Sequence, residues 1–242
     1  MNDERKVAVY AGTRNLYEQM YVALKSLLFN TQMDMVYLFI EDDEFPFELP
    51  ENVKPVNVSE QDYFLPGGPN FASNWSYMTM LRCVLGMMLP NETKVLWLDC
   101  DTIVDEDISD LFSLDINGYY YAAAMEPAKS KDVFRYVNAG VLLCNLQLLR
   151  EMCKEHEMMA FLNVCKFNWV DQDCINLLCQ GRIRVIGSEY NSNSFTVPVI
   201  RPKIVHFAAV PADEMKQNWL FKKYEVLEFG VKDNDKRAGK NP

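Results

Sequence analysis

Two aspartates two positions apart are the residues of this chain best placed to do chemistry. Asp99 and Asp101 follow the apolar run 95–98, which predicts a buried strand with both carboxylates at its carboxyl end. On an extended strand the two side chains share one side, roughly 7 Å apart at Cβ. If they approached to about 5 Å at an effective dielectric near 20, their repulsion would be about 3 kcal/mol, so a proton or a cation should lie between them. Because a hard divalent ion held by carboxylates completes its shell with phosphate oxygens, the pair predicts a metal site for a phosphate-bearing substrate.

Other interpretations of the acidic residues are tested by spacing. A calcium loop starting at Asp99 or Asp105 needs glycine at its sixth position, where this chain has Val104 or Asp110, so an EF-hand is excluded. A haloacid-dehalogenase-type phosphatase also places Asp-x-Asp after an apolar strand. That family usually continues with Gly-Thr, whereas Thr102-Ile103 stands here, so a phosphohydrolase is the second choice. Helix capping is the weaker explanation for the pair but the better one for the acids that follow, which are Asp105, Glu106, Asp107 and Asp110.

Three further motifs carry polar groups at the ends of apolar runs. His206 lies near the end of the run 204–207, where a lone histidine is ordinarily a satisfied core side chain. Asn138-Ala139-Gly140 interrupts a predicted strand with a small turn. Asp171-Gln172-Asp173 opens a predicted helix, and capping accounts for one aspartate but leaves the other and the glutamine unexplained. Trp169, just ahead, is the best candidate among the tryptophans for stacking on a sugar.

Alternating strands and helices must position these motifs. Apolar runs predict strands at 7–11, 35–40, 53–58, 95–98, 119–125, 137–144 and 204–207. Helical spacing predicts helices over 17–28, 75–89, 146–161 and 171–180, with Ser73 or Asn74 capping the second and Asn145 the third. Arg82 falls on the apolar stripe of the second helix, so it needs an anionic partner. This order of elements predicts an α/β domain with a largely parallel sheet.

Composition narrows the class of protein. The 242 residues are 49% hydrophobic, enough for one domain with elaborations. With 24 Lys and Arg against 34 Asp and Glu, the net charge of −10 argues against a nucleic-acid binder or a general binder of anionic membranes. Seven cysteines, several within apolar runs, predict reduced core thiols in a cytoplasmic protein. No stretch approaches the roughly 20 apolar residues of a transmembrane helix, and no secretory signal is recognised.

The C-terminal region differs from the rest in charge. From Lys216 to Pro242 there are seven basic and four acidic residues, a local charge of +3. We expect a domain over 1–220 and a loosely structured basic tail over 221–242. A solvated tail is the favoured interpretation, and weak peripheral contact with an anionic membrane surface is the alternative.

Taken in order, these motifs closely resemble the family 8 glycosyltransferases of the galactosyltransferase and glycogenin type. The motifs are the segment 7–28 with its Gly-Thr-Arg-Asn loop, the helix with Arg82, Asp99-Cys100-Asp101, the run 136–146, Asp171-Gln172-Asp173 and 204–207. The resemblance implies a single GT-A-type domain with a mostly parallel, Rossmann-like nucleotide-binding sheet flanked by helices. It also implies retaining, metal-dependent transfer of a hexose of the glucose or galactose class from a UDP-sugar. The acceptor is left open between a glycan, a lipid-linked compound and a protein.

The resemblance also implies roles for individual residues. Asp99, Asp101 and His206 would hold Mn²⁺, or Mg²⁺ in its place. The catalytic group would be Gln172, near the reacting face of the donor sugar, with Asp171 and Asp173 beside it. The residues expected to contact the nucleotide sugar are Ala11, Thr13, Asn15, Arg82, Asp99, Cys100, Asn138 and Ala139.

The chain departs from the family pattern at two places. Many members have an acidic residue where Thr13 stands, and many have Lys-Pro-Trp shortly after the strand histidine, which is absent from 207–219. A leaving diphosphate develops negative charge that another cation should offset, and Lys216, ten residues beyond His206, is the candidate. These departures keep a non-catalytic sugar-nucleotide-binding protein as a further alternative.

Overall fold

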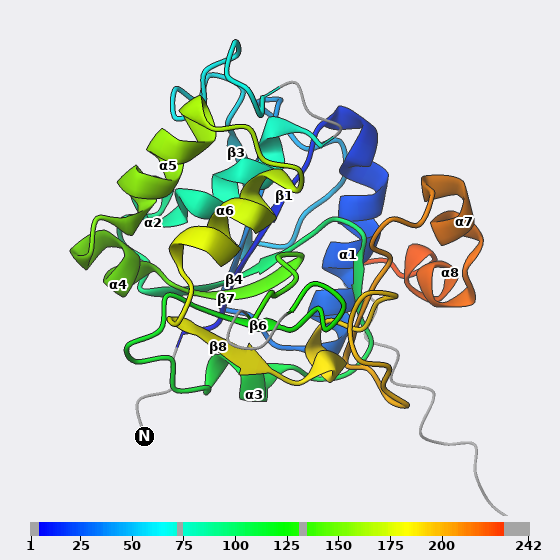
Figure 1. Ribbon diagram of the computed structural model, residues 1–242. Coiled ribbons are helices and arrows are strands. Elements are labelled where there is room, and N and C mark those ends of the chain that lie inside the picture. Colours follow the sequence, from blue (N-terminus) through cyan, green and yellow to red (C-terminus); the bar gives the residue numbers. More distant parts are fainter. Residues whose placement is uncertain (1–4, 72–74, 131–134, 230–242) are drawn as a thin grey trace, which may run out of the picture.

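The computed structural model describes residues 5–71, 75–130 and 135–229. Its centre is a seven-stranded sheet in the order β3-β2-β1-β4-β7-β6-β8 (Figure 1). Four of the six neighbouring pairs are parallel, and the two that involve β7 are antiparallel. The predicted α/β fold with a mostly parallel sheet is therefore confirmed. The strands are β1 (Val7–Ala11), β2 (Met35–Ile40), β3 (Val53–Asn57), β4 (Lys94–Leu98), β6 (Tyr121–Ala124), β7 (Val141–Asn145) and β8 (Ile183–Ile186).

Helices cover both faces of this sheet, which explains why its central strands are apolar throughout. Val7 and Val9 of β1 face one core, whereas Ala8 and Tyr10 face the other. The first face is covered by α2 (Leu85–Met88), α4 (Leu146–Glu151), α5 (Lys154–Val164) and α6 (Val170–Leu178). The second is covered by α1 (Tyr17–Asn30), which follows the short 3₁₀ helix η1 (Arg14–Leu16), and by α3 (Ser109–Phe112).

A separate two-stranded sheet brings distant parts of the chain together. Its strands are β5 (Thr102–Val104) and β9 (Ile204–His206), and their antiparallel register pairs Thr102 with His206. The predicted strand at 204–207 thus exists but lies outside the central sheet. Because β5 begins directly after Asp101, this pairing places His206 beside the acidic pair.

Two of the four predicted helices are broken in the structure. The helix predicted over 75–89 is a 3₁₀ helix, η2 (Tyr77–Cys83), followed by α2. Ser76 caps η2 by accepting the Met78 backbone N–H, while the predicted caps Ser73 and Asn74 lie outside the described residues. The helix predicted over 146–161 breaks into α4 and α5 at Cys153, whose φ is 51°. Asn145 caps α4 as predicted, since its side chain accepts the Leu148 N–H.

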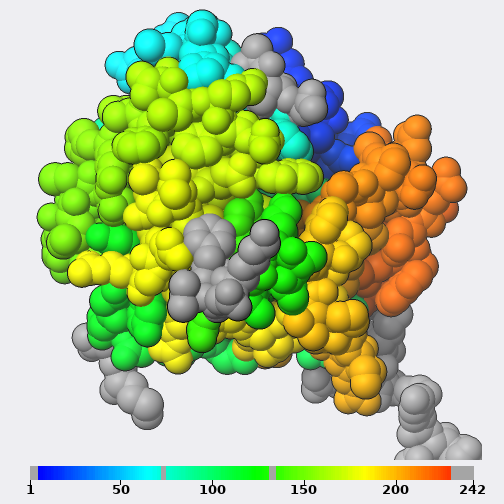
Figure 2. Space-filling model, viewed as in Figure 1, coloured from blue at the N-terminus to red at the C-terminus, as the bar shows by residue number. Residues whose placement is uncertain are grey.

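The C-terminal part of the described chain forms a third packing unit. Helices α7 (Ala212–Gln217) and α8 (Trp219–Glu225) pack against α1 and the β5–β9 sheet (Figure 2, orange beside blue). The expected domain boundary at 220 falls inside α8. Phe221 and Tyr224, which follow that boundary, are buried against Val22 of α1 and Ile103 of β5. Residues 230–242 of the predicted tail lie outside the described residues.

Candidate active site

A cavity of about 460 Å³ opens where β1 and β4 end, and its lining residues come from both halves of the chain. The size is in the range of small-molecule sites. Asp99, Asp101 and His206 line it together with two groups of residues of different character, which we call its polar and apolar walls. The polar wall consists of Glu126, Lys129, Asn138 and Gln172. The apolar wall consists of Ala11, Leu16, Gln19, Ala208, Ala209, Val210 and Met215.

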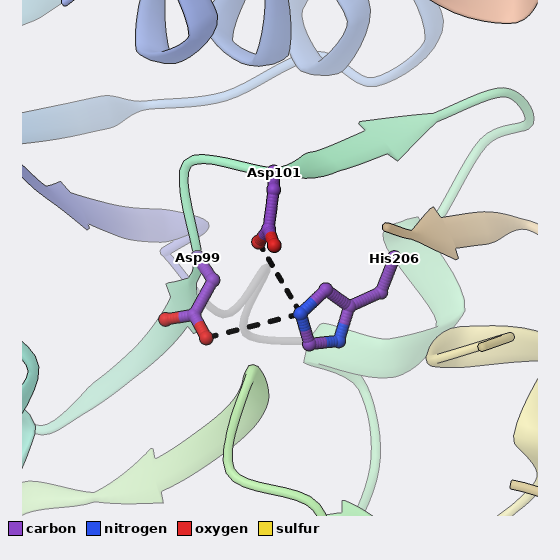
Figure 3. Close-up of side chains that lie close together, drawn as sticks. All are labelled: Asp99, Asp101 and His206. Atoms are coloured by element: carbon purple, nitrogen blue, oxygen red, sulfur yellow. Dashed lines mark ion pairs between the residues drawn. The ribbon is translucent and has the colours of Figure 1, made fainter. Parts of the chain in front are cut away.

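Asp99, Asp101 and His206 form one cluster (Figure 3). His206 Nε2 lies 3.2 Å from Asp101 Oδ1 and 3.9 Å from Asp99 Oδ2, and one ligand atom from each residue lies within 4.8 Å of the others. The aspartates do not lie on an extended strand as predicted. They occupy a turn after β4, closed by the Thr102 N–H donating to the Asp99 carbonyl at 3.1 Å, which brings both carboxylates to the same imidazole.

Asp99 is bonded to its neighbours through one carboxylate oxygen, and its other oxygen faces His206. Its Oδ1 accepts hydrogen bonds from Arg82 Nη2 and Trp97 Nε1, each at 2.8 Å. The Arg82 guanidinium also lies over the Trp97 ring, 4.7 Å from its centroid. Oδ2 therefore remains available as a ligand beside His206.

His206 is oriented by its other ring nitrogen. Nδ1 lies 2.9 Å from Asn191 Oδ1, and Asn191 in turn donates from Nδ2 to Asn138 Oδ1 at 2.8 Å. With the Asn191 oxygen as acceptor for an Nδ1 proton, Nε2 is the ring nitrogen that faces the two aspartates, and this is the arrangement typical of metal-ligating histidines. Gly140 makes room for the ring, because a Cβ there would overlap the imidazole.

The cluster shifts the protonation of its own members. Burial raises the pKa of Asp99 against the opposing effect of Arg82. Burial also works to raise the pKa of Asp101, but His206 outweighs it and lowers that pKa. For His206 burial disfavours the cation, yet Asp101 and Asp99 outweigh burial and raise its pKa. A cation bound here would take the place of the imidazole proton, so its affinity should fall with decreasing pH.

Arg82 has the anionic partners that its position predicted, but it is not on the cavity surface. Its side chain is 3% exposed and ion-paired with Asp99 at 2.8 Å and Asp171 at 3.0 Å. Its remaining donor, Nη1, bonds to the Ala139 carbonyl. Burial raises the pKa of Asp171 to about 6, although Arg82 opposes the shift. Arg82 and Asp171 thus lie behind the site and position Asp99.

Gln172 and Asp173 have separate roles. Gln172 lines the cavity, accepting the Ala139 N–H at 2.9 Å and donating to Glu126 Oε1 at 3.2 Å. Asp173 accepts the Trp169 N–H at 2.8 Å and the Tyr136 hydroxyl at 2.5 Å. Of the two aspartates in this motif, Asp173 caps the helix and Asp171 pairs with Arg82.

The structure adds Glu126 and Lys129 to the site, which the sequence analysis missed. Glu126 is 2% exposed, accepts from Asn138 Nδ2 at 2.7 Å, and lies 3.0 Å from Lys129 Nζ. Lys129 Nζ also lies 4.0 Å from the centroid of the Trp169 ring. Glu126 follows the end of an apolar strand, the same signal that singled out Asp99, so position alone could have found it.

Several residues expected at the nucleotide lie at or outside the edge of the cavity. Ala11 and Cys100 line it, and Cys100 Sγ donates to the Ala11 carbonyl at 3.1 Å. Thr13 and Asn15 bond to each other at 2.6 Å and are not among the lining residues. Lys216 is also absent from the lining and pairs with Glu18 at 2.7 Å.

A family comparison settles what kind of domain this is. The model of the glycosyl transferase family 8 matches residues 9–210. The chain belongs to glycosyl transferase family 8. Membership excludes the phosphohydrolase alternative for the Asp-x-Asp motif.

Curated relatives are longer than this family 8 chain. The glycosyltransferase GlyE of Streptococcus pneumoniae serotype 4 (strain TIGR4) is 30% identical over an alignment of 210 residues, which covers 79% of this chain and 48% of GlyE. The lipopolysaccharide 1,2-glucosyltransferase of Escherichia coli K12 is 31% identical over an alignment of 124 residues, which covers 45% of this chain and 35% of that enzyme. The chain therefore spans about half the length, or less, of these relatives.

Solved structures share the fold. The galactosyltransferase LgtC, solved with donor and acceptor sugar analogs, superposes with a TM-score of 0.70 at 21% identity, covering 92% of this chain and 98% of LgtC. The crystal structure of GlyE gives 0.69 at 21% identity, covering 93% of this chain and 61% of GlyE. The family 8 chain thus has the GT-A fold. Among its described helices, none is both long and apolar enough to cross a membrane.

Proposed function

We propose that this chain is a retaining, metal-dependent glycosyltransferase that moves a hexose of the glucose or galactose class from a UDP-sugar to a glycan acceptor. The observation that carries the proposal is the cluster of Asp99, Asp101 and His206 in the cavity, next to a wall of hydrogen-bonding side chains. Retention and the uridine donor are what the family resemblance implies. The seven cysteines, none in a disulfide, support a cytoplasmic location.

The three residues fit a divalent cation. Two carboxylates and one imidazole whose Nε2 is turned toward them are a donor set for Mn²⁺, and Mg²⁺ is the substitute. When bound, such an ion acts as a Lewis acid that stabilises the leaving diphosphate. The described lining of the cavity carries three carboxylates but one lysine, so it repels a diphosphate until a cation binds.

The polar wall supplies the groups that a hexose needs. Glu126, Asn138 and Gln172 are joined by hydrogen bonds and present carboxylate and carboxamide atoms, which accept from and donate to sugar hydroxyls. We assign the donor hexose to this wall, with Gln172 nearest the reacting face. The exposed rings of Trp75 and Trp169, with centroids 5.1 Å apart, flank it and are the surface we assign to the acceptor.

The proposal is tested by incubating the protein with a panel of nucleotide sugars and Mn²⁺ and identifying the released nucleotide. We expect uridine diphosphate from a UDP-hexose, and an α-linked product by proton NMR. Asp101→Asn should abolish release, whereas Asp62→Asn, the same change at an exposed aspartate outside the cavity, should not. Tight binding of UDP-hexoses without turnover would instead identify a sugar-nucleotide-binding protein, and an inverted product would contradict retention.

A further inference from the structure

The apolar wall contains one polar side chain, Gln19, which forms no hydrogen bond with the residues that the structure describes. Gln19 is 5% exposed and lines the cavity, yet its carboxamide has no hydrogen-bond partner among the described residues. Its amide atoms are not among the buried polar atoms that lack a partner, so they are open to the cavity. A carboxamide placed in this way can bond to a ligand in the cavity without breaking a hydrogen bond within the protein.

The position of Gln19 indicates which part of a ligand it meets. It lies in the first turn of the 14-residue helix α1, one turn after Leu16, and both residues face the cavity. The N-terminus of a helix favours negative charge. Ala11, at the start of the same connection, accepts from Cys100, which stands between the two aspartates of the metal cluster. Gln19 and the three residues of the metal cluster thus line the same cavity.

The rest of this wall offers an anion no charged partner. Its other members are alanine, leucine, valine and methionine side chains. The neighbouring cation, Lys216, is paired with Glu18 and lies outside the lining. Gln19 is thus the single polar side chain that the apolar wall directs into the cavity.

We propose that Gln19 donates a hydrogen bond to the diphosphate of the donor nucleotide. This inference rests on the proposed function. The neutral carboxamide of Gln19 would take the place of a lysine. The diphosphate would then be held by the cation at the metal cluster and by this uncharged carboxamide on the apolar wall. On the apolar wall, recognition of the diphosphate would depend on the hydrogen bond from Gln19 and on the N-terminus of α1, with no second cation involved.

The proposal is tested by measuring the affinity of UDP by isothermal titration calorimetry in saturating Mn²⁺, and the affinity of uridine by ligand-observed NMR. Gln19→Leu should weaken UDP binding about 10-fold through the lost hydrogen bond. Gln19→Glu should weaken it about 100-fold, because it adds a like charge beside the diphosphate. Neither change should alter the affinity of uridine. Gln180→Leu, an exposed glutamine outside the cavity, is the control and should leave both affinities unchanged.

The melting temperature of each variant separates a binding role from a structural one. Because Gln19 makes no internal hydrogen bond among the described residues, Gln19→Leu should fold and melt within a few degrees of the wild type. UDP affinity unchanged in both Gln19 variants, or uridine weakened as much as UDP, would overturn this inference while leaving the proposed function intact. A wild-type protein that binds no UDP in Mn²⁺ would overturn the proposed function, and this inference with it.

Discussion

The two walls of the cavity differ in how far their polar side chains are already hydrogen-bonded within the protein. On the polar wall, Glu126, Asn138 and Gln172 are already bonded to one another, and Arg82 and Asp171 form a charged layer behind them. On the apolar wall a single carboxamide, Gln19, stands among hydrocarbon side chains. One wall is preorganised by its own network, whereas the other depends on the ligand to complete it.

Because of this difference, we expect changes in the two walls to affect different quantities, namely turnover and nucleotide affinity. A preorganised network holds groups in place for a transition state without reorganising, so damage to it should appear in turnover. A wall that meets the ligand through one neutral donor contributes ground-state affinity, so damage to it should appear in nucleotide binding. The metal cluster lines the same cavity, so damage to it should affect both turnover and nucleotide binding.

The largest effect is expected from Gly140→Ala, which alters the metal cluster of Asp99, Asp101 and His206. The added methyl would overlap the His206 ring and displace it from Asp99 and Asp101. We expect the affinity for Mn²⁺ to fall about 100-fold, measured by calorimetry. Gly67→Ala is the control, because a Cβ there meets no atom within 4 Å. Unchanged Mn²⁺ affinity in Gly140→Ala would show that His206 is not a ligand.

The next effect tests the polar wall alone. Gln172→Ala removes the donor to Glu126 and the acceptor for the Ala139 N–H. We expect kcat to fall about 10²- to 10³-fold, the scale for losing one stabilising donor, with UDP affinity within about threefold of the wild type. Gln180→Ala should change neither quantity. Should UDP affinity fall as far as kcat, the division of labour between the walls would be wrong.

The pH dependence of stability tests the buried carboxyl group of Glu155, which lies near the helix that carries Arg82. Glu155 is 1% exposed and accepts the Gly86 N–H just after η2, the element that carries Arg82, and burial raises its pKa to about 7. Between pH 4.5 and 7 the native state keeps this proton whereas the unfolded chain releases it. The contribution of Glu155 to the free energy of unfolding should therefore fall, by up to about 3 kcal/mol, as the pH rises through this window, and level off above it.

Chemical denaturation at a series of pH values measures this dependence. Glu155→Gln should remove most of the slope between pH 6 and 7, while the exposed Glu60→Gln should leave it as in the wild type. An equal slope in Glu155→Gln would place the titrating group elsewhere.

The smallest effect concerns the backbone of the apolar wall. Ala209 has a φ of 61° in a turn that the Val210 N–H closes on the Phe207 carbonyl at 2.9 Å. Glycine adopts this conformation at lower cost, so Ala209→Gly should stabilise the protein by up to about 1 kcal/mol. Ala208→Gly, in the same turn without a positive φ, should destabilise it by about 0.5–1 kcal/mol. Equal shifts of the unfolding midpoint would contradict strain at Ala209.

The sequence predicted those parts of the fold that local patterns encode. Apolar runs located the central strands, and helical spacing located α1 and α6. The three-residue strands β5 and β9 are too short to show a period, and their pairing, which delivers His206 to Asp101, depends on the tertiary fold. The partner of the Gly86 N–H in the first turn of α2 is likewise distant, because Glu155, which accepts it, lies 69 positions further along the chain.

For the site, residue type was a better guide than geometry. The need of Arg82 for anions was predicted correctly, because a buried guanidinium must be paired. Its contact with the donor stays a prediction, and in the structure Arg82 donates to the backbone carbonyls of Thr79 and Ala139. Gln19 carries no sequence signal at all, since a glutamine on a helix is ordinarily a surface residue and only the fold turns this one into a cavity.

The most direct test of the account is calorimetric titration of UDP into the protein with Mn²⁺ and with EDTA. Because the described lining repels a diphosphate, we expect binding with Mn²⁺ and none detectable with EDTA. Asp99→Asn and Asp101→Asn should each lose the Mn²⁺-dependent binding while remaining folded, since each change relieves a repulsion between carboxylates. UDP binding of equal strength in EDTA, or in both variants with Mn²⁺, would contradict a metal-dependent site at Asp99, Asp101 and His206.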